Sequence, residues 1–468
     1  MACGALLAAT TCGQPAMTAG RLAVGPTTAK PNLVLILTDD QRWDQLTYMP
    51  TVESELVAKG MTFTNGFVTD PLCCPSRASI LRGQYSHGTG VYQVGGPFGA
   101  YHRWHFMGDP KSTIATWLHD AGYYTGFYGK YFNGYKRPDL QKGWDQWHAF
   151  LSQGNLYYNY NEVQPDGSTV AYGSRPQDYS TDVIAAQADS FIRGADPAKP
   201  FFLDFDPRAP HAPALAAPRY ANATCPAAPL PPSLNEDTSD KPAYIRGHAP
   251  KGPSVAKAGW LKQCRSLYAV DDAVRTILTA LQDTGRLSNT VIVFTSDNGF
   301  LNGEHNTTGK KVPYEESIRV PMVVRYDPVT GGVPTSDPHL VANIDIAPTL
   351  AAAAGVVPPI AEDGASMLPL LSGTATSWRT DLLLEGYDDP AKPTGGEYVP
   401  TYCGLRTERY AYIRYGTGEE ELYDLQTDPY EMTNLLFHNT DPAIDALHAT
   451  LLTRLKQLCS PPPPHYTI

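Results

Sequence analysis

The chain reads Asn32-Leu-Val-Leu-Ile-Leu-Thr-Asp-Asp40 near its beginning, and this stretch indicates the fold class. A short, unbroken aliphatic run is typical of a strand that is covered on both faces, as in a parallel sheet. A second stretch has the same form, Thr290-Val-Ile-Val-Phe-Thr-Ser-Asp-Asn-Gly299. Ligand sites of open α/β sheets lie at the carboxyl ends of such strands. We therefore expect the polar residues that follow the two runs to form one site.

Other segments extend the alternation of strands and helices. Three more short runs predict strands, at 125–128, 201–205 and 321–325. Apolar residues at helical spacing predict a helix over 267–281 that ends near Gly285. This alternation indicates an α/β domain.

The pattern changes near residue 377. Two antiparallel strands are predicted at 381–385 and 410–415, followed by a turn over 422–429 and a terminal helix. We therefore predict three parts: a flexible N-terminal segment, an α/β catalytic domain and a smaller C-terminal α+β domain, over residues 1–30, 31–376 and 377–468.

Composition limits the function. The 468 residues carry a net charge of −11, which argues against a nucleic-acid or anionic-membrane partner. The longest apolar runs are far shorter than the ~20 residues that a membrane-spanning helix needs. The opening MACGALLAATTCG resembles a shortened secretory signal, so we expect a secreted or periplasmic protein, with a cytoplasmic location as the alternative.

The eight cysteines contain no Cys-x-x-Cys pair, which argues against zinc held by thiolates. Four of them are widely spaced and could form one or two disulfides or remain buried thiols: Cys225, Cys264, Cys403 and Cys459. The sequence does not determine the pairing.

The densest group of reactive side chains lies in Pro71-Leu-Cys-Cys-Pro-Ser-Arg77, which continues to Gly83. It resembles the maturation motif of type I sulfatases, Cys-x-Pro-Ser-Arg followed by Leu-x-Gly. A separate formylglycine-generating enzyme oxidises the cysteine of that motif to formylglycine. Further motifs of the family occur in the same order: Asp39-Asp40, Gly129-Lys130, Pro210-His211-Ala-Pro213, Asp297-Asn298-Gly299, Gly309-Lys310 and Tyr314-Glu315.

The residues of these motifs are most similar to those of the arylsulfatase and N-acetylglucosamine-6-sulfatase branch. The resemblance implies an alkaline-phosphatase-like fold, with a mixed, mostly parallel sheet flanked by helices. It also implies hydrolysis of an O-sulfate ester, of an aryl or sugar alcohol, to the alcohol and inorganic sulfate.

The resemblance assigns roles to several residues. Cys73, not Cys74, becomes the formylglycine, whose hydrate has one hydroxyl to attack sulfur and another to expel sulfate afterwards. Arg77 anchors the hydrate, Lys130 and Lys310 contact sulfate, and His211 lies by the leaving oxygen, with Lys310 as the proton donor. A helix over 76–85 would direct its positive N-terminal end toward Cys73.

The oxygen-bearing residues of the two strand ends are Asp39, Asp40, Asp297 and Asn298. Oxygen ligands without thiolate or imidazole favour a hard cation, Ca²⁺ or Mg²⁺. The resemblance selects Ca²⁺ and adds the modified Cys73 as a ligand.

The chain departs from the family at one catalytic position. Many sulfatases read Gly-Lys-Trp-His, whereas this chain reads Gly129-Lys-Tyr-Phe132, so the histidine that deprotonates the hydrate is missing. We expect His87 to replace it. Arg82 and Arg208 could shape substrate choice or be surface charges, and His305 is open to the same two readings.

Two other functions are consistent with the same residues. Phosphonate monoesters and phosphodiesters present a similar tetrahedral anion, so a hydrolase of the same superfamily for those esters is one alternative. A non-catalytic protein that binds sulfated glycans is the other, if Cys73 is never oxidised.

Overall fold

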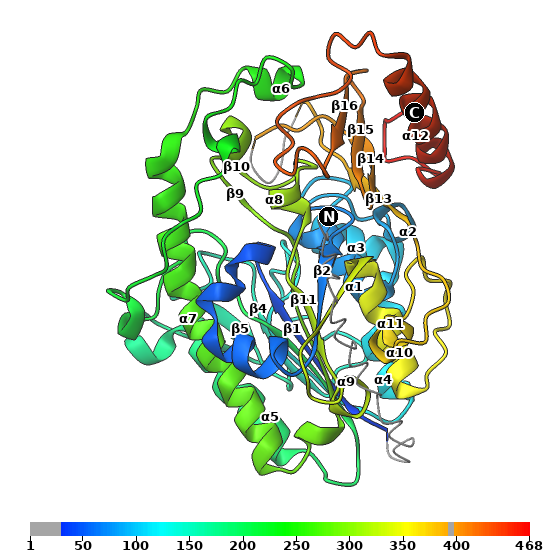
Figure 1. Cartoon of the computed structure of the whole chain (residues 1–468). Coiled ribbons are helices and arrows are strands. Elements are labelled where there is room, and N and C mark those ends of the chain that lie inside the picture. Colours follow the sequence, from blue (N-terminus) through cyan, green and yellow to red (C-terminus); the bar gives the residue numbers. More distant parts are fainter. Residues whose placement is uncertain (1–29, 392–396) are drawn as a thin grey trace, which may run out of the picture.

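The computed structural model describes residues 30–391 and 397–468, so the segment predicted over 1–30 lies outside the described residues except for Lys30. A ten-stranded mixed sheet forms its centre, in the order β12-β2-β11-β8-β1-β7-β3-β4-β5-β6 (Figure 1). Its strands are β1 (Asn32–Thr38), β2 (Met61–Phe67), β3 (Tyr124–Lys130), β4 (Gln146–Phe150), β5 (Asn161–Val163), β6 (Thr169–Ala171), β7 (Phe201–Asp206), β8 (Thr290–Ser296), β11 (Met322–Arg325) and β12 (Thr335–Ala342).

The middle of the sheet is parallel. Strands β8, β1, β7, β3 and β4 run in one direction, whereas β11 is antiparallel to both β8 and β2. The two aliphatic runs of the sequence are direct neighbours, paired from Asn32 with Thr290 to Thr38 with Ser296. Their carboxyl ends therefore lie side by side at one edge of the sheet.

The buried side chains of β1 divide between two cores, as expected for a strand covered on both faces. Leu33, Leu35 and Leu37 pack into a core with side chains of α1, α4 and α10, whereas Val34 and Ile36 pack with α5 and α7. Figure 1 shows these two groups of helices on opposite sides of the sheet. The helices are α1 (Cys73–Arg82), α2 (Ser86–Thr89), α3 (Ala100–Met107), α4 (Ile114–Asp120), α5 (Ser180–Gly194), α6 (Ala243–Arg246), α7 (Gly252–Asp283), α8 (Glu315–Ile318), α9 (Asp327–Thr330), α10 (Ile346–Ala354), α11 (Leu368–Ser372) and α12 (Pro442–Leu458).

Two helices differ from their predicted bounds. Helix α1 was expected over 76–85, but it begins at Cys73 and ends at Arg82. Proline is tolerated in the first helical turn, so Pro75 does not delay the start, and Gly83 ends the helix in the left-handed conformation at φ 66°. Helix α7 covers the predicted segment but already begins at Gly252.

The C-terminal part is a four-stranded antiparallel sheet in the order β13-β14-β15-β16. Its strands are β13 (Asp381–Gly386), β14 (Tyr402–Thr407), β15 (Tyr410–Tyr415) and β16 (Glu420–Asp424), so the first part of the predicted turn over 422–429 is strand instead. One face packs on the large domain through Leu382 and Ile413, and the other packs under α12 through Leu405 and Leu455. The domain boundary near residue 376 stays a prediction.

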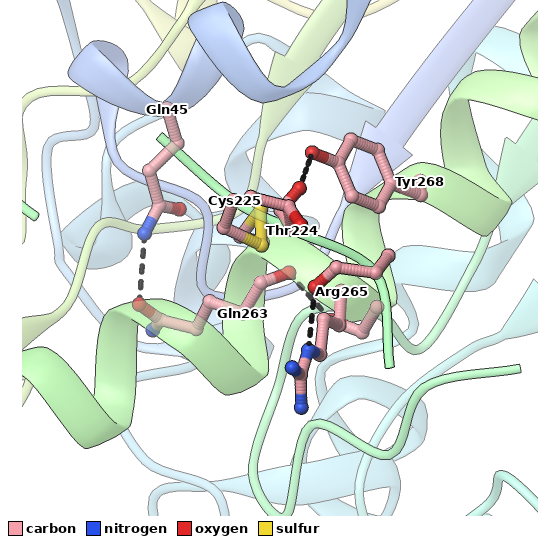
Figure 2. The surroundings of a disulfide bond; sticks show 9 residues. Gln45, Thr224, Cys225, Gln263, Arg265 and Tyr268 are labelled. Atoms are coloured by element: carbon pink, nitrogen blue, oxygen red, sulfur yellow. Dashed lines mark hydrogen bonds between the residues drawn. A yellow bond between two sulfur atoms is a disulfide. The ribbon is translucent and has the colours of Figure 1, made fainter. Parts of the chain in front are cut away.

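Two disulfides link distant parts of the chain, Cys225–Cys264 and Cys403–Cys459. Figure 2 shows the first of them, which fastens the long loop before α6 to helix α7. Neighbouring bonds reinforce it: Tyr268 donates to the carbonyl of Thr224 at 2.8 Å, and Arg265 donates to that of Ala223 at 3.0 Å. Among the described residues, no helix has the length and apolar character required to cross a membrane.

Candidate active site

The polar ends of β1 and β8 meet at the carboxyl edge of the sheet. Asp39, Asp40, Asp297 and Asn298 are all buried. The backbone N–H of Asp40 donates to Asp297 Oδ1 at 3.2 Å, and Asn298 Nδ2 donates to Asp40 Oδ1 at 2.7 Å. Pairing of the two strands in register thus brings together residues more than 250 positions apart.

Cys73 is the first residue of α1 and points at these strand ends. Its Sγ lies 3.5 Å from Asp39 Oδ1 and accepts a hydrogen bond of 2.8 Å from Lys310 Nζ. Burial raises the pKa of the Cys73 thiol to about 11, so the unmodified side chain is a neutral thiol near pH 7. The neighbouring Cys74 faces elsewhere, with its Sγ 3.5 Å from Asn133 Oδ1.

Two lysines hold the acids of the strand ends. Lys130 Nζ donates to Asp39 Oδ2 at 2.5 Å, and Lys310 Nζ donates to Asp40. Burial acts to raise the pKa of Asp39, but Lys130 and the other nearby cations hold it well below its ordinary value. Burial likewise acts to lower the pKa of Lys310, and Asp40 raises it above its ordinary value, so the ammonium stays charged.

Arg77 lies on the same side of α1 as Cys73. Its Nε donates to Asp297 at 2.8 Å, and its Nη1 donates to Asp206 at 2.6 Å. The remaining Nη2 is buried and has no hydrogen-bond partner among the described residues. A buried, unpaired donor is costly, so Nη2 has a free donor that a bound anion or hydroxyl could accept from.

His211 lies in the loop after β7, at the opening of the site. Its Nδ1 donates to the carbonyl of Ala212 at 2.7 Å, which leaves Nε2 as the acceptor of the neutral ring, 3.7 Å from Asp40 Oδ2. Burial lowers the pKa of His211 well below its ordinary value, and the nearby cations oppose a further charge.

The donor atoms fit a hard divalent cation. Asp40 Oδ2 and Asn298 Oδ1 are buried and have no hydrogen-bond partner among the described residues. Candidate ligand atoms of Asp39, Asp40, Cys73 and His211 all lie within 4.8 Å of one another. Buried oxygens without partners are expensive unless they coordinate an ion, and carboxylate and amide oxygens are the ligands that Ca²⁺ and Mg²⁺ prefer.

Three of the other residues singled out in the sequence lie outside this group. His87 Nδ1 bonds Glu385 Oε1 at 3.0 Å, and none of its described contacts is with Cys73, which favours a structural role over that of base. Arg82 is paired with Asp109. His305 is buried and paired with Glu236 and Glu316.

Sequence reasoning missed one participant, Asp206, and left the role of another, Arg208, open. Asp206 ends β7 and orients Arg77, and Arg208 Nη1 donates to Asp39 Oδ2 at 2.8 Å. A signal for Asp206 was present, because it follows a predicted buried strand as Asp39 does. Arg208 is nearly buried, so of the two readings left open for it, the surface charge is wrong.

A cavity of about 180 Å³ opens on the group. Asp40, His211 and Lys310 form its floor. The arrangement therefore presents a nucleophile position, cations and free oxygen ligands to a ligand of limited size.

Comparison with known proteins identifies this arrangement. The chain matches the family model described as Sulfatase over residues 31–356, and that described as N-sulphoglucosamine sulphohydrolase, C-terminal, over 303–460. It is 31% identical to an arylsulfatase of Volvox carteri, covering 92% of this chain and 76% of that protein. It is 33% identical to the N-acetylglucosamine-6-sulfatase of Homo sapiens, covering 89% and 83%. The chain belongs to the sulfatase family and is a sulfuric ester hydrolase.

Solved structures share the fold. One, in complex with its substrate D-glucosamine-2-N,6-O-disulfate, superimposes with a TM-score of 0.80 at 24% identity, covering 93% of this chain and 99% of the other. A phosphonate monoester hydrolase of Agrobacterium radiobacter gives 0.73 at 21%, covering 92% and 95%. The predicted alkaline-phosphatase-like architecture, with its C-terminal antiparallel sheet, is confirmed.

Proposed function

We propose that the chain hydrolyses O-sulfate esters of sugars, and aryl sulfates as simpler substrates, with a formylglycine made from Cys73. The observation that carries the proposal is the position of Cys73 Sγ, at the start of α1 and in contact with both Asp39 and Lys310. A thiol with a raised pKa at this point is a poor nucleophile, which supports its conversion. The hydrate of the aldehyde would supply two hydroxyls, one to attack sulfur and one to expel sulfate.

The protein's own groups would bind and orient the ester. Lys310 bonds Cys73 and Lys130 bonds the neighbouring Asp39, so both would offer ammonium groups to the sulfate oxygens. Arg77 Nη2 is a donor without a partner and would hold a hydroxyl of the hydrate. Lys310 would protonate the leaving oxygen, with His211 beside it.

A divalent cation, Ca²⁺ or in its place Mg²⁺, would be held by Asp39, Asp40, Asp297, Asn298 and the modified Cys73. When bound, it would lower the pKa of the attacking hydroxyl and neutralise charge on the sulfate oxygens. The support is the pair of buried oxygens without partners, Asp40 Oδ2 and Asn298 Oδ1.

Conversion of Cys73 would need a formylglycine-generating enzyme as a partner during maturation. We also propose that the protein is exported. Two disulfides support an oxidising compartment. Relatives named extracellular sulfatase occur in Drosophila melanogaster and, as a putative one, in Caenorhabditis elegans, at 32% and 31% identity.

The test is a comparison of initial rates with protein produced together with a formylglycine-generating enzyme. N-acetylglucosamine-6-sulfate and p-nitrophenyl sulfate are compared with a phosphodiester and a phosphonate monoester. We expect sulfate esters to be hydrolysed faster, and Cys73→Ala to remove turnover while the matched Cys74→Ala keeps it. Faster turnover of the phosphorus esters would favour the superfamily alternative, and binding without turnover would favour a glycan-binding protein.

A further inference from the structure

The cavity above the strand ends has walls from three separate segments. Tyr244 of α6 and His248 just after it form one wall, and Thr307 and Val312, which flank the Lys310 loop, form the second. The third wall belongs to the segment before β14, with Glu397, Tyr398 and Val399. Pockets for drug-sized ligands measure roughly 300–1,000 Å³, so a cavity of about 180 Å³ suits one ring and not an oligosaccharide.

Charged groups of both signs line the cavity. The Lys310 ammonium on the floor would bind an anion, beside the Asp40 carboxylate with which it pairs. Another wall carries the carboxylate of Glu397, whose Oε2 lies 3.4 Å from His248 Nε2 and 3.4 Å from Thr307 Oγ1. Both contacts are long, so hydrogen-bond donors of a ligand could replace them at little cost.

The wall also offers unused polar capacity beside apolar surface. His248 Nδ1 is buried and has no hydrogen-bond partner among the described residues. Tyr244, Phe300 and Tyr398 also line the cavity and add aromatic surface to it. A sugar ring has the matching chemistry, because it combines hydroxyl donors with apolar C–H faces.

On this basis, which rests on the function proposed above, we propose that Glu397 and His248 determine substrate specificity. They bind the hydroxyl or amide donors of a single sulfated sugar whose sulfate lies at Lys310. The negative charge of Glu397 disfavours a second anionic group beside it, and the size of the cavity restricts the enzyme to a sugar that can enter as one ring, as a chain end can.

The test compares kcat/KM for N-acetylglucosamine-6-sulfate and for p-nitrophenyl sulfate in the mature, metal-loaded enzyme. The aryl ester has no hydroxyls for the wall to bind. In Glu397→Gln we expect the ratio of the two values, sugar over aryl, to fall about tenfold, as expected for the loss of one charge-assisted hydrogen bond. The change should lie in KM, because binding to this wall is the same in the ground and transition states. His248→Gln should lower the same ratio.

Glu408→Gln is the matched control, because Glu408 is an exposed glutamate in the β14–β15 turn. It should leave both kcat/KM values unchanged. An unchanged ratio in Glu397→Gln, or a loss confined to kcat, would overturn the inference. A wild-type enzyme inactive on both sulfate esters would instead contradict the proposed function, so the two failures are distinguishable.

Discussion

Two of the buried clusters of charge among the described residues differ in how the charge is neutralised. The first is the site cluster at the strand ends, with Asp39, Asp40 and their lysines. The second, the His305 cluster, consists of His305, Glu236, Glu316 and Glu431. Among the described residues, the cavity is lined by members of the first cluster and by none of the second.

The His305 cluster carries its own cation. His305 Nδ1 lies 3.0 Å from Glu236, its Nε2 lies 3.5 Å from Glu316, and its ring stacks on Tyr314 with centroids 4.0 Å apart. Burial would lower the pKa of His305, but the two carboxylates raise it to about 10. Glu431 follows β16 in the chain, so the cluster also joins the C-terminal part to the large domain.

The partners available to a buried polar cluster decide whether it contributes to stability or to ligand binding. An ion pair closed off from solvent stabilises the fold only as a complete set. Both clusters contain buried side-chain oxygens without hydrogen-bond partners among the described residues, such as Asp40 Oδ2 in the site cluster and Glu431 Oε1 in the His305 cluster. They differ in access, because Asp40 lines the cavity, where a ligand can satisfy its free oxygen. The predictions below test this division.

The largest effect should follow removal of the cation from the site cluster. We expect a chelator to lower kcat by about 10³-fold or more, because charge on the sulfate oxygens is then no longer neutralised. The fold should persist, because Lys130 and Lys310 already pair with Asp39 and Asp40. Activity assays and circular dichroism before and after Ca²⁺ is restored measure both. Full activity in a chelator-treated Asp39→Asn/Asp297→Asn double variant would refute the metal assignment.

In the His305 cluster, we expect the reverse, a loss of stability with a smaller loss of turnover. His305→Gln should lower the free energy of unfolding by about 3–5 kcal/mol, because the buried carboxylates lose their cation. The folded pKa is raised, so the contribution of His305 is full below pH 6.5 and disappears as the pH rises through about 10.

Urea unfolding at several pH values between these limits checks that sign. The wild type should lose stability as the pH rises, and the variant should show a flatter curve. A variant with wild-type stability and a loss of turnover comparable to that of chelation would contradict the division between the clusters.

The sequence predicted the main features of both the sheet and the site. Continuous aliphatic runs are reliable indicators of central parallel strands, and the residues after them could be placed at one edge. The pairing of Cys225 with Cys264 could not be predicted, because connectivity depends on the path of the loop between them. The roles of Arg208 and Glu397 were also hidden, since irregular loops carry no periodicity that places their side chains.

The first disulfide should have an intermediate effect. Cys225→Ser/Cys264→Ser removes the link between α7 and the segment from β7 to α7, which carries His211 in its loop and Tyr244 on α6. Release of this loop should lower the free energy of unfolding by about 2–4 kcal/mol. Denaturant unfolding of the double variant measures it, with reduced wild-type protein as the reference. Equal stability of variant and wild type would show that the hydrogen bonds in Figure 2 suffice.

The smallest effect is expected at His87. The sequence predicts it as a base of the site, but it is paired with a carboxylate, as His305 is. Its bond to Glu385 raises its pKa against the effect of burial, as for a structural ion pair. His87→Ala should cost about 1–3 kcal/mol of stability and leave the acidic limb of the pH–rate profile in place. Disappearance of that limb, with a normal fold, would restore His87 as the base.

The chemical state of residue 73 tests the central claim most directly. Mass spectrometry of the peptide that contains Cys73 and Cys74, from protein made with the maturation enzyme, should show an aldehyde at position 73 and an intact thiol at 74. An unmodified thiol at position 73 in protein that still hydrolyses sulfate esters would contradict the account.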